Sequence, residues 1–405
     1  MKAVLIKYGE LFLKSESVKR WYITLLLDNL RHAFDSLGLE FSFEVHRGRI
    51  LIEGPDPAAL AGAARRIFGI VGVAVCTRTR SDRAEIEAAA VLMAMKNLKP
   101  GMSFAVRARR SGVSGFTSQE LAASIGAAVI RDIQGIHVDL TSPDYELFVE
   151  ARDFGGLLYD HILPGPGGVP LGTQGEVLSL LSAGIDSPVA SWLMMRRGSR
   201  VVHLHCDGGK WAGRDVFETA MAHHRVLSTW SPGTPLFLIV ADLEPFFRAL
   251  STRAAVKNRC VICKRFMLRI ASRIARMRGA KALVTGDNLG QVASQTLANM
   301  AVTGMVVPCD LPLLRPLITN DKEETIAVAR TIGTFRDDAG DLGCLAVPRH
   351  PSIAADTAAI EADEEKMDCD GIECAVIGAL RCFRARDGAI EEINSQKFRF
   401  LQQSR

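Results

Sequence analysis

The sequence predicts an α/β protein in which an α+β first half precedes a second half built on a parallel sheet. After residue 176, short apolar stretches alternate with helical segments, as in EVLSLL, RVVHLHC, PLFLIV and KALVTG. This alternation is typical of a parallel sheet with helices on both faces. Ahead of it, HILPGPGGVPLGTQG (161–175) holds three prolines and five glycines and marks the clearest domain boundary.

Composition places the chain among globular proteins of more than one domain. Its 405 residues exceed one ordinary core and predict two to four domains, with 48% hydrophobic residues and a net charge of +4. The mild positive charge permits a nucleic-acid partner. No apolar run reaches about 18 residues, and the N-terminus lacks the apolar core of a signal peptide. We therefore expect a cytoplasmic protein with no membrane contact, whose nine cysteines are buried, catalytic or metal-binding.

The first half alternates short strands with amphipathic helices. Apolar spacing from Ser17 to Leu37, followed by Gly38, predicts a helix and its stop. The segment SFAVRARRS alternates apolar and basic residues, as a strand with one basic face does. Further strands are expected at 2–8, within 41–54, at 69–79, within 137–152 and at 155–162, and further helices at 58–68, 82–97 and 118–133.

The stretch LSLLSAGIDSPVASW (178–192) predicts a strand, a turn of small residues and a helix. Ser187 suits the N-cap of that helix and Pro188 its first position. Free N–H groups and the helix dipole favour an anion at such a turn, which lies at the carboxyl edge of a parallel sheet. The turn lacks the Gly-Lys-Ser/Thr of a Walker loop. From these residues alone, an ordinary capped βα turn is the alternative.

Several segments together resemble one family. SAGIDSPVA resembles the S-G-G-x-D-S motif of PP-loop ATP pyrophosphatases, with Ala183 in place of the usual glycine. Other segments resemble tRNA 4-thiouridine synthetases of the ThiI type, and they follow the family's order along nearly the whole chain. These segments are TGDNLGQVASQT (285–296), CKRFMLRIA (263–271), LRPLITNDKEETIAVARTIGT (314–334), IKYGELFLKS (6–15) and FGIVGV (68–73).

The resemblance implies a domain order. It implies a PP-loop ATP pyrophosphatase domain, adenine nucleotide alpha hydrolase-like, preceded by α+β ferredoxin-like and THUMP domains. The expected boundaries are a ferredoxin-like domain at 1–57, a THUMP domain at 58–165, a linker at 166–175, the PP-loop domain at 176–350 and a helical tail at 351–405. The acidic segment 355–368 is expected to be a solvated helix.

The resemblance also implies an activity. The family uses ATP to adenylate a uridine of tRNA, at position 8, releasing pyrophosphate; sulfur then displaces AMP and leaves 4-thiouridine. It implies ATP and Mg²⁺, tRNA, a sulfur donor that is sulfide or a persulfide carrier, and a homodimer. The resemblance leaves open whether the protein also takes part in thiamine synthesis. Asp186 is expected to bind Mg²⁺ or act in adenylation, and Asp287 to lie near the reacting centre. The implied ATP contacts are Leu180, Leu181, Ser182, Gly184, Asp186, Ser187, His205, Cys206, Lys264, Gly286 and Gln295.

Three cysteines are expected to take part in the transfer of sulfur. Cys260 and Cys263 form a C-x-x-C before a helix, which suits a metal, a cluster or a redox pair. One family branch carries a rhodanese domain. Because the sequence reaches only Arg405 after Cys344, we expect this chain to resemble the other branch. The other branch pairs the C-x-x-C with a distant cysteine, here Cys344, to hold a [4Fe–4S] cluster with one open iron. The alternatives are a persulfide on Cys344 resolved by the pair, and inert buried thiols.

The remaining expectations concern RNA and the other cysteines. Arg107, Arg109 and Arg110 are expected to grip tRNA phosphates, with a solvated basic strand face as the alternative. The cysteines near the C-terminus, at 369, 374 and 382, are expected to be structural or incidental, with a metal site as the alternative. Two other functions compete with tRNA 4-thiolation: another PP-loop enzyme, and an RNA-binding protein whose PP-loop half has decayed.

Overall fold

The computed structural model describes residues 2–10, 14–338 and 340–394. The chain divides into two compact units: Met1–Lys14 with Ala33–Gly168, and Ser15–His32 with Val169–Arg405. In the expected tail, residues 395–405 lie outside the described residues. None of the described helices is both long enough and apolar enough to cross a lipid bilayer.

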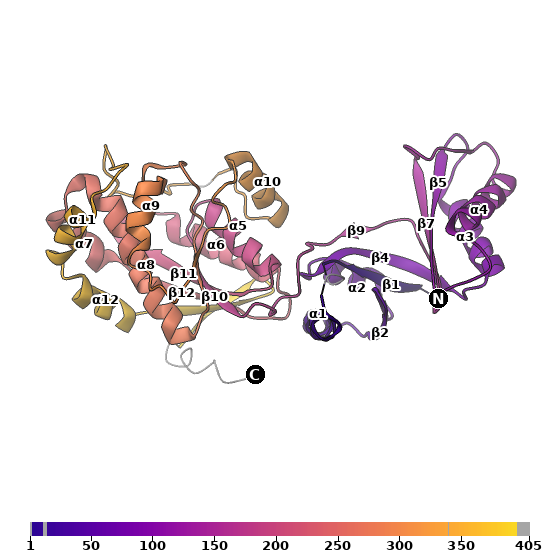
Figure 1. The fold of residues 1–405 in the computed structure, drawn as a ribbon, viewed down its shortest axis with the longest axis horizontal. Helices are drawn as coiled ribbons and strands as arrows, with labels where there is room; N and C mark the ends of the chain where they lie inside the picture. Colours follow the sequence, from indigo (N-terminus) through magenta and orange to yellow (C-terminus); the bar gives the residue numbers. More distant parts are fainter. Residues whose placement is uncertain (1, 11–13, 339, 395–405) are drawn as a thin grey trace. The chain divides into compact units, whose positions relative to one another are not determined.

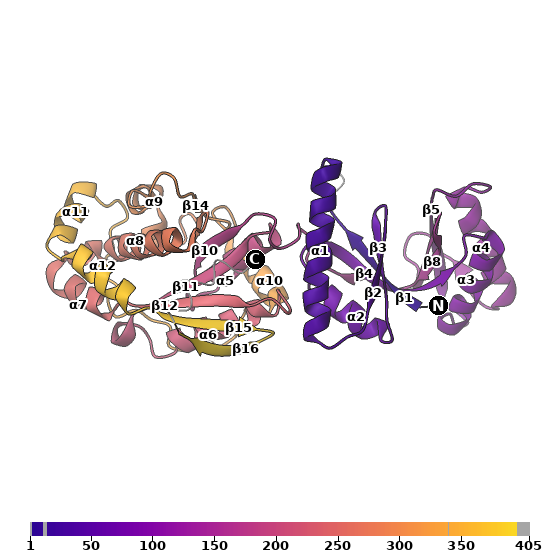
Figure 2. The same ribbon diagram turned by 90° about the horizontal axis from the view of Figure 1, so that it is seen from below.

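The first unit is built on one long sheet. Its strand order is β2-β3-β1-β4-β8-β7-β5-β6, with β9 paired to β4. Helices α3 and α4 lie against β5 and β7, and α2 packs on β1 and β4 (Figures 1 and 2). The strands are β1 (Lys2–Tyr8), β2 (Ser42–His46), β3 (Arg49–Glu53), β4 (Ile70–Thr79), β5 (Ser103–Ser111), β6 (His137–Val138), β7 (Tyr145–Arg152), β8 (Gly155–Tyr159) and β9 (Leu163–Pro164), and the helices before residue 168 are α1 (Glu16–Ser36), α2 (Pro57–Ala64), α3 (Arg83–Asn97) and α4 (Ser118–Asp132).

A buried ion pair shows that this sheet is strongly bent, because it joins two strands that are not neighbours in the sheet. Arg49 of β3 donates two hydrogen bonds of 3.0 Å to the carboxylate of Glu150 on β7, although β1, β4 and β8 lie between these strands in the sheet. Arg152 and Tyr159 also donate to Glu150, whose side chain is 1% exposed. Burial raises the pKa of Glu150, but the guanidinium groups of Arg49 and Arg152 outweigh burial and lower it to about 2.

The second unit confirms the predicted parallel sheet and extends it. The strand order is β14-β13-β10-β11-β12-β15-β16, in which β14 to β12 run parallel and β15 pairs antiparallel with β12. The hairpin β15–β16 lies in the segment expected to be a helical tail. Strand β15 pairs with β12 along an edge that would otherwise be open, and β16 pairs with β15. The strands are β10 (Glu176–Leu180), β11 (Arg200–Asp207), β12 (Leu236–Asp242), β13 (Leu283–Val284), β14 (Leu313–Leu314), β15 (Arg381–Arg386) and β16 (Ala389–Ile393).

Helices cover both faces of this second sheet. Helices α5, α6 and α10 gather on one face and α7, α8, α11 and α12 on the other (Figures 1 and 2). Buried residues of α7 and α8 pack on the apolar face of β10, β11 and β12. The helices are α5 (Asp186–Arg196), α6 (Val216–Ser228), α7 (Glu244–Arg253), α8 (Arg259–Arg278), α9 (Leu297–Gly304), α10 (Lys322–Ile332), α11 (Thr357–Glu365) and α12 (Cys369–Gly378).

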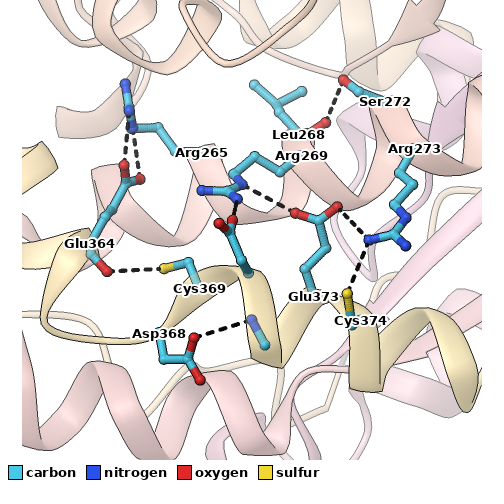
Figure 3. A network of polar contacts seen from close by, with 12 residues as sticks. Arg265, Leu268, Arg269, Ser272, Arg273, Glu364, Asp368, Cys369, Glu373 and Cys374 are labelled. Atoms are coloured by element: carbon cyan, nitrogen blue, oxygen red, sulfur yellow. Dashed lines mark hydrogen bonds and ion pairs between the residues drawn. The ribbon is translucent and has the colours of Figure 1, made fainter.

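Arginines one helical turn apart on α8 fasten α11 and α12 to the unit (Figure 3). Arg265 forms a bidentate ion pair of 2.8 Å with Glu364, Arg269 contacts Glu373, and Arg273 contacts Glu373 and Cys374. The expectation of a solvated acidic helix is therefore wrong for part of α11. Glu364 is buried, because Arg265 neutralises it.

Replacing Glu150 tests the curled sheet. Glu150→Gln should reduce the free energy of unfolding by about 3–5 kcal/mol at pH 7, because it leaves buried cations without their carboxylate. Since the folded pKa is depressed, the stabilisation is complete above the unfolded pKa and is lost as pH falls through about 2. In urea unfolding, the wild-type advantage should therefore shrink by roughly 1 kcal/mol between pH 7 and pH 3.5. An advantage unchanged with pH would contradict the ion-pair account.

Candidate functional site

A cavity of about 300 Å³ opens at the carboxyl ends of β10 and β11 in the second unit. Parallel strands place their carboxyl ends on one edge, so loops distant in sequence meet there. Every residue that the sequence assigned to ATP lines this cavity: Leu180, Leu181, Ser182, Gly184, Asp186, Ser187, His205, Cys206, Lys264, Gly286 and Gln295. Asp287 also lines it, while the three cysteines assigned to sulfur do not.

The loop between β10 and α5 is held by its own serines. The Ser182 N–H donates to Ser187 Oγ at 2.8 Å, and the Gly184 N–H donates to Ser182 Oγ at 3.2 Å. Helix α5 begins at Asp186, so the expectation that Ser187 caps it is wrong. Ser187 instead reaches back to close the loop. The substitution at Ala183 causes no strain, since its φ is not among the positive values of the described residues.

Gly286 lets a second segment approach this loop. A Cβ at Gly286 would lie 2.8 Å from the Ser187 nitrogen and 2.9 Å from the Asp186 carbonyl carbon. These are backbone atoms, which cannot move aside as a flexible side chain does. A glycine is therefore required where the strand β13 ends against the start of α5.

Asp186, the first residue of α5, has two partners outside its own loop. Lys322 at the start of α10 contacts both carboxylate oxygens, at 2.9 and 3.1 Å, and Gln291 donates at 3.0 Å. Neither partner was predicted from the sequence. Lys322 lies 136 residues from Asp186, and no local pattern connects them.

Two further residues that line the cavity, Lys264 and Asp287, form an ion pair. Lys264 Nζ is 2.8 Å from Asp287 Oδ1, and Arg315 approaches the other carboxylate oxygen at 3.5 Å. Burial raises the pKa of Asp287, but the Lys264 charge and hydrogen bonds from Lys264, Thr285 and Gln295 outweigh it and lower the pKa. Asp287 is therefore ionised and is paired with Lys264, which lines the cavity, while Arg315 contacts it from outside the lining.

Two acceptor atoms at the cavity have no partner within the described part of the chain. His205 is hydrogen-bonded through Nδ1 to the Leu181 carbonyl at 2.9 Å, and burial lowers the pKa of its imidazole. The neutral ring donates from Nδ1, which leaves Nε2 as an acceptor. Among the described residues, no partner reaches His205 Nε2 or Gln295 Oε1. Both atoms can accept a hydrogen bond from a ligand amine.

The cysteines assigned to sulfur converge from two distant segments. Cys260 and Cys263 lie in the first turns of α8, and Cys344 forms an isolated bridge with Ala212. Burial first, and then Cys344, raise the pKa of both Cys260 and Cys263. Cys206 adds to the effect on Cys263, so the group lies beside the cavity wall.

The structure does not arrange these thiols as a finished metal site. In the described stretches, no three histidine, cysteine or acidic side chains are grouped closely enough to hold a metal ion. The thiols are nevertheless free, and Cys344 is exposed. Their chemistry fits an iron–sulfur cluster, which takes thiolate ligands.

The three arginines assigned to RNA lie on β5 of the first unit. Arg107 is paired with Glu146, and Arg110 donates to the Val113 carbonyl. Arg109 is exposed. The pKa of Lys7 is lowered mainly by burial, is raised by Glu150, and is lowered further by the charges of Arg49 and Arg109. Arg49 and Arg152 act on Lys7 in the same direction and form ion pairs with Glu150, and Arg109 lies opposite Glu150 in the register of β5 and β7. Lys7, Arg49 and Arg152 were not predicted from the sequence, because they lie on three different strands.

Three family models match the chain in order. They are the ThiI ferredoxin-like domain over residues 3–74, the THUMP domain over 80–159, and "Thiamine biosynthesis protein (ThiI)" over 172–369. A Methanosarcina mazei protein named "Probable tRNA sulfurtransferase" is 37% identical over 387 residues, covering 94% of this chain and 95% of its own. The Pyrobaculum aerophilum protein named "tRNA sulfurtransferase" is 38% identical over 338 residues, covering 83% of this chain and 67% of its own.

A solved structure has the same fold. The crystal structure of a 4-thiouridine synthetase–RNA complex with bound ATP matches with a TM-score of 0.83 and 27% identity. The match covers 97% of this chain and all of that one. This structure and the sequence relatives span both units.

Substitution of Gly286 tests the close approach at the cavity. Gly286→Ala should weaken ATP binding at least about tenfold, because the added methyl displaces the start of α5 from the loop. Gly304→Ala is the matched control, since it meets no atom within 4 Å. Isothermal titration with ATP measures both variants. Equal affinities for the two would contradict the role of Gly286.

Proposed function

We propose that this chain, which belongs to the ThiI family, is an ATP-dependent tRNA sulfurtransferase that makes 4-thiouridine, with the uridine at position 8 as its target. The observation that supports this best is the convergence of every sequence-assigned ATP residue on one cavity, in a family whose relatives are named tRNA sulfurtransferase. ATP is the substrate that this cavity takes. The bound ATP of the matched 4-thiouridine synthetase supports the same assignment.

The cavity residues divide into an adenine end and a phosphate end. The acceptor His205 Nε2, which no described residue reaches, suits the exocyclic amine of adenine, which donates hydrogen bonds. Gln295 binds the same Asp287 oxygen as Lys264 and so lies beside that lysine. The loop from Ser182 to Ser187 presents N–H groups at a helix start, which suits the phosphates. Lys264 is held at the wall by Asp287 and supplies positive charge for the leaving pyrophosphate.

The proposed reaction has two steps. The uridine carbonyl oxygen attacks the α-phosphorus of ATP and pyrophosphate leaves, carrying Mg²⁺ as ATP commonly does. A sulfur nucleophile then attacks the activated ring carbon, and AMP leaves with the former carbonyl oxygen. Asp186 is proposed to act at the phosphate end, where Lys322 holds its carboxylate.

For the sulfur step we propose a [4Fe–4S] cluster held by Cys260, Cys263 and Cys344. Held by these three thiolates, such a cluster would leave one iron able to bind sulfide. The free thiols and their mutual electrostatic effect support this assignment. The exposed Cys344 favours a second candidate, in which Cys344 carries a persulfide and the other two cysteines act as its redox partners.

For tRNA we propose a binding face on the first unit around β5. Arg107, Arg109 and Arg110 follow one another along that strand, and Arg109 belongs to the cation group around Glu150. Lys7, Arg49, Arg109 and Arg152 gather around Glu150, and this concentration of cations favours a polyanion. The matched 4-thiouridine synthetase was crystallised with RNA, which supports the assignment. A tRNA-bridged homodimer is part of the same proposal.

The activity is tested with unmodified tRNA, ATP and sulfide under anaerobic conditions. We expect ATP-dependent pyrophosphate release and a thiolated uridine whose sulfur maps to position 4 of the ring. Lys264→Met should lower the rate of pyrophosphate release roughly 100-fold, because the cavity loses its paired cation. Lys281→Met, on an exposed lysine that does not line the cavity, is the control. Sulfur at another ring position would point to a different thiolating enzyme.

The cluster is tested by iron and acid-labile sulfide content after anaerobic purification. We expect about four irons per chain, lost in Cys260→Ala and kept in Cys309→Ser, a variant of an exposed cysteine outside the group. Absence of iron together with full thiolation from a persulfide donor would overturn the cluster. Cys344 would then be the sulfur carrier.

A further inference from the structure

Buried histidines bind two successive carbonyls of the loop between β10 and α5. His205 of β11 is bonded to the Leu181 carbonyl at 2.9 Å, and His223 of α6 is bonded through Nδ1 to the Ser182 carbonyl at 3.2 Å. His223 is 3% exposed and does not line the cavity. Burial lowers the pKa of His223 more than the backbone carbonyls raise it, so the ring is neutral.

The bond from His223 sets the direction of a neighbouring N–H. In a trans peptide the C=O and the following N–H point in opposite directions. Binding the Ser182 carbonyl at His223 therefore turns the Ala183 N–H away from that ring, at a position between Ser182 and Gly184, which both line the cavity. In the described part of the chain, the Ala183 N–H is donated to no backbone acceptor.

A second contact connects the loop to α10. Lys322 at the start of α10 holds Asp186, and Ser187 Oγ donates to the same Ser182 carbonyl at 3.4 Å. The loop cannot rotate its Ser182–Ala183 peptide without breaking the contact with His223.

We infer that His223 is a positioning residue that holds the Ala183 N–H toward the phosphates of ATP. His223 touches no reacting atom and acts only through the Ser182 carbonyl. The inference rests on the proposed function and extends it, because it names a residue outside the cavity that the ATP site requires. It also gives the loop an N–H donor at the position where the family motif has glycine.

Three variants at position 223 separate positioning from packing. His223→Leu keeps the volume but removes the donor. His223→Asn places its amide nitrogen near the Nδ1 position, while His223→Gln places it nearer to Nε2. We expect His223→Leu to lower kcat for tRNA-dependent pyrophosphate release at least about tenfold, and His223→Asn to recover most of that loss. His223→Gln should stay close to the leucine variant, and tRNA affinity should be unchanged in all three.

The outcomes are distinct. Wild-type kcat in His223→Leu, or equal loss in the Asn and Gln variants, would overturn the positioning role. If His223→Leu does not fold, the comparison of the Asn and Gln variants decides by itself, with urea unfolding to show that both are folded. Failure of the wild-type protein to release pyrophosphate from ATP would count against the proposed function instead.

Discussion

The Lys264–Asp287 ion pair is the contact on which the arrangement of the second unit depends. An ionised carboxylate as buried as Asp287 costs several kcal/mol unless a cation neutralises it. That cation comes from the start of α8, at 2.8 Å. This ion pair therefore places the first turns of α8 beside the end of β13. The other side chains of those turns, including Cys260 and Cys263, are placed there as well. Cys263 is the neighbour of Lys264 in sequence, so the ion pair also fixes the place of the cysteine group.

Helical periodicity lets α8 serve three parts of the unit at once. Cys260, Cys263 and Lys264 follow the i, i+3, i+4 spacing and share one side of the helix. Arg265, Arg269 and Arg273, at successive intervals of four, point to the acidic residues of α11 and α12 (Figure 3). The C-terminal segment is thus bound to the same helix that carries the cavity lysine. Cys374 takes part in that contact through Arg273, in keeping with the structural role expected for it.

Local patterns and parallel topology made part of the site predictable from the sequence. The cavity residues of β10 and β11 were predictable because strand ends of a parallel sheet share one edge, and a family motif marked the loop. Lys322 and Arg315 were not, because each reaches its carboxylate from a distant loop with no periodic signal. Glu150 escaped notice for a related reason: its partner Arg49 lies on a strand separated from β7 by β1, β4 and β8 and meets it only because the sheet curls. The hairpin β15–β16 was missed because its short, charged strands resemble surface segments.

The loop itself shows how peptide geometry limits what the motif residues must be. A loop that binds phosphates through N–H groups has to direct its carbonyls elsewhere, and the protein interior must then supply donors for them. Here His205 and His223 supply those donors, while the hydroxyls of Ser187 and Ser182 accept the N–H groups of Ser182 and Gly184. Because His223 fixes the orientation of the Ser182–Ala183 peptide, the backbone at Ala183 keeps an ordinary negative φ. Glycine's freedom is then unnecessary at that position, whereas at Gly286 the close approach of the Ser187 backbone makes it indispensable.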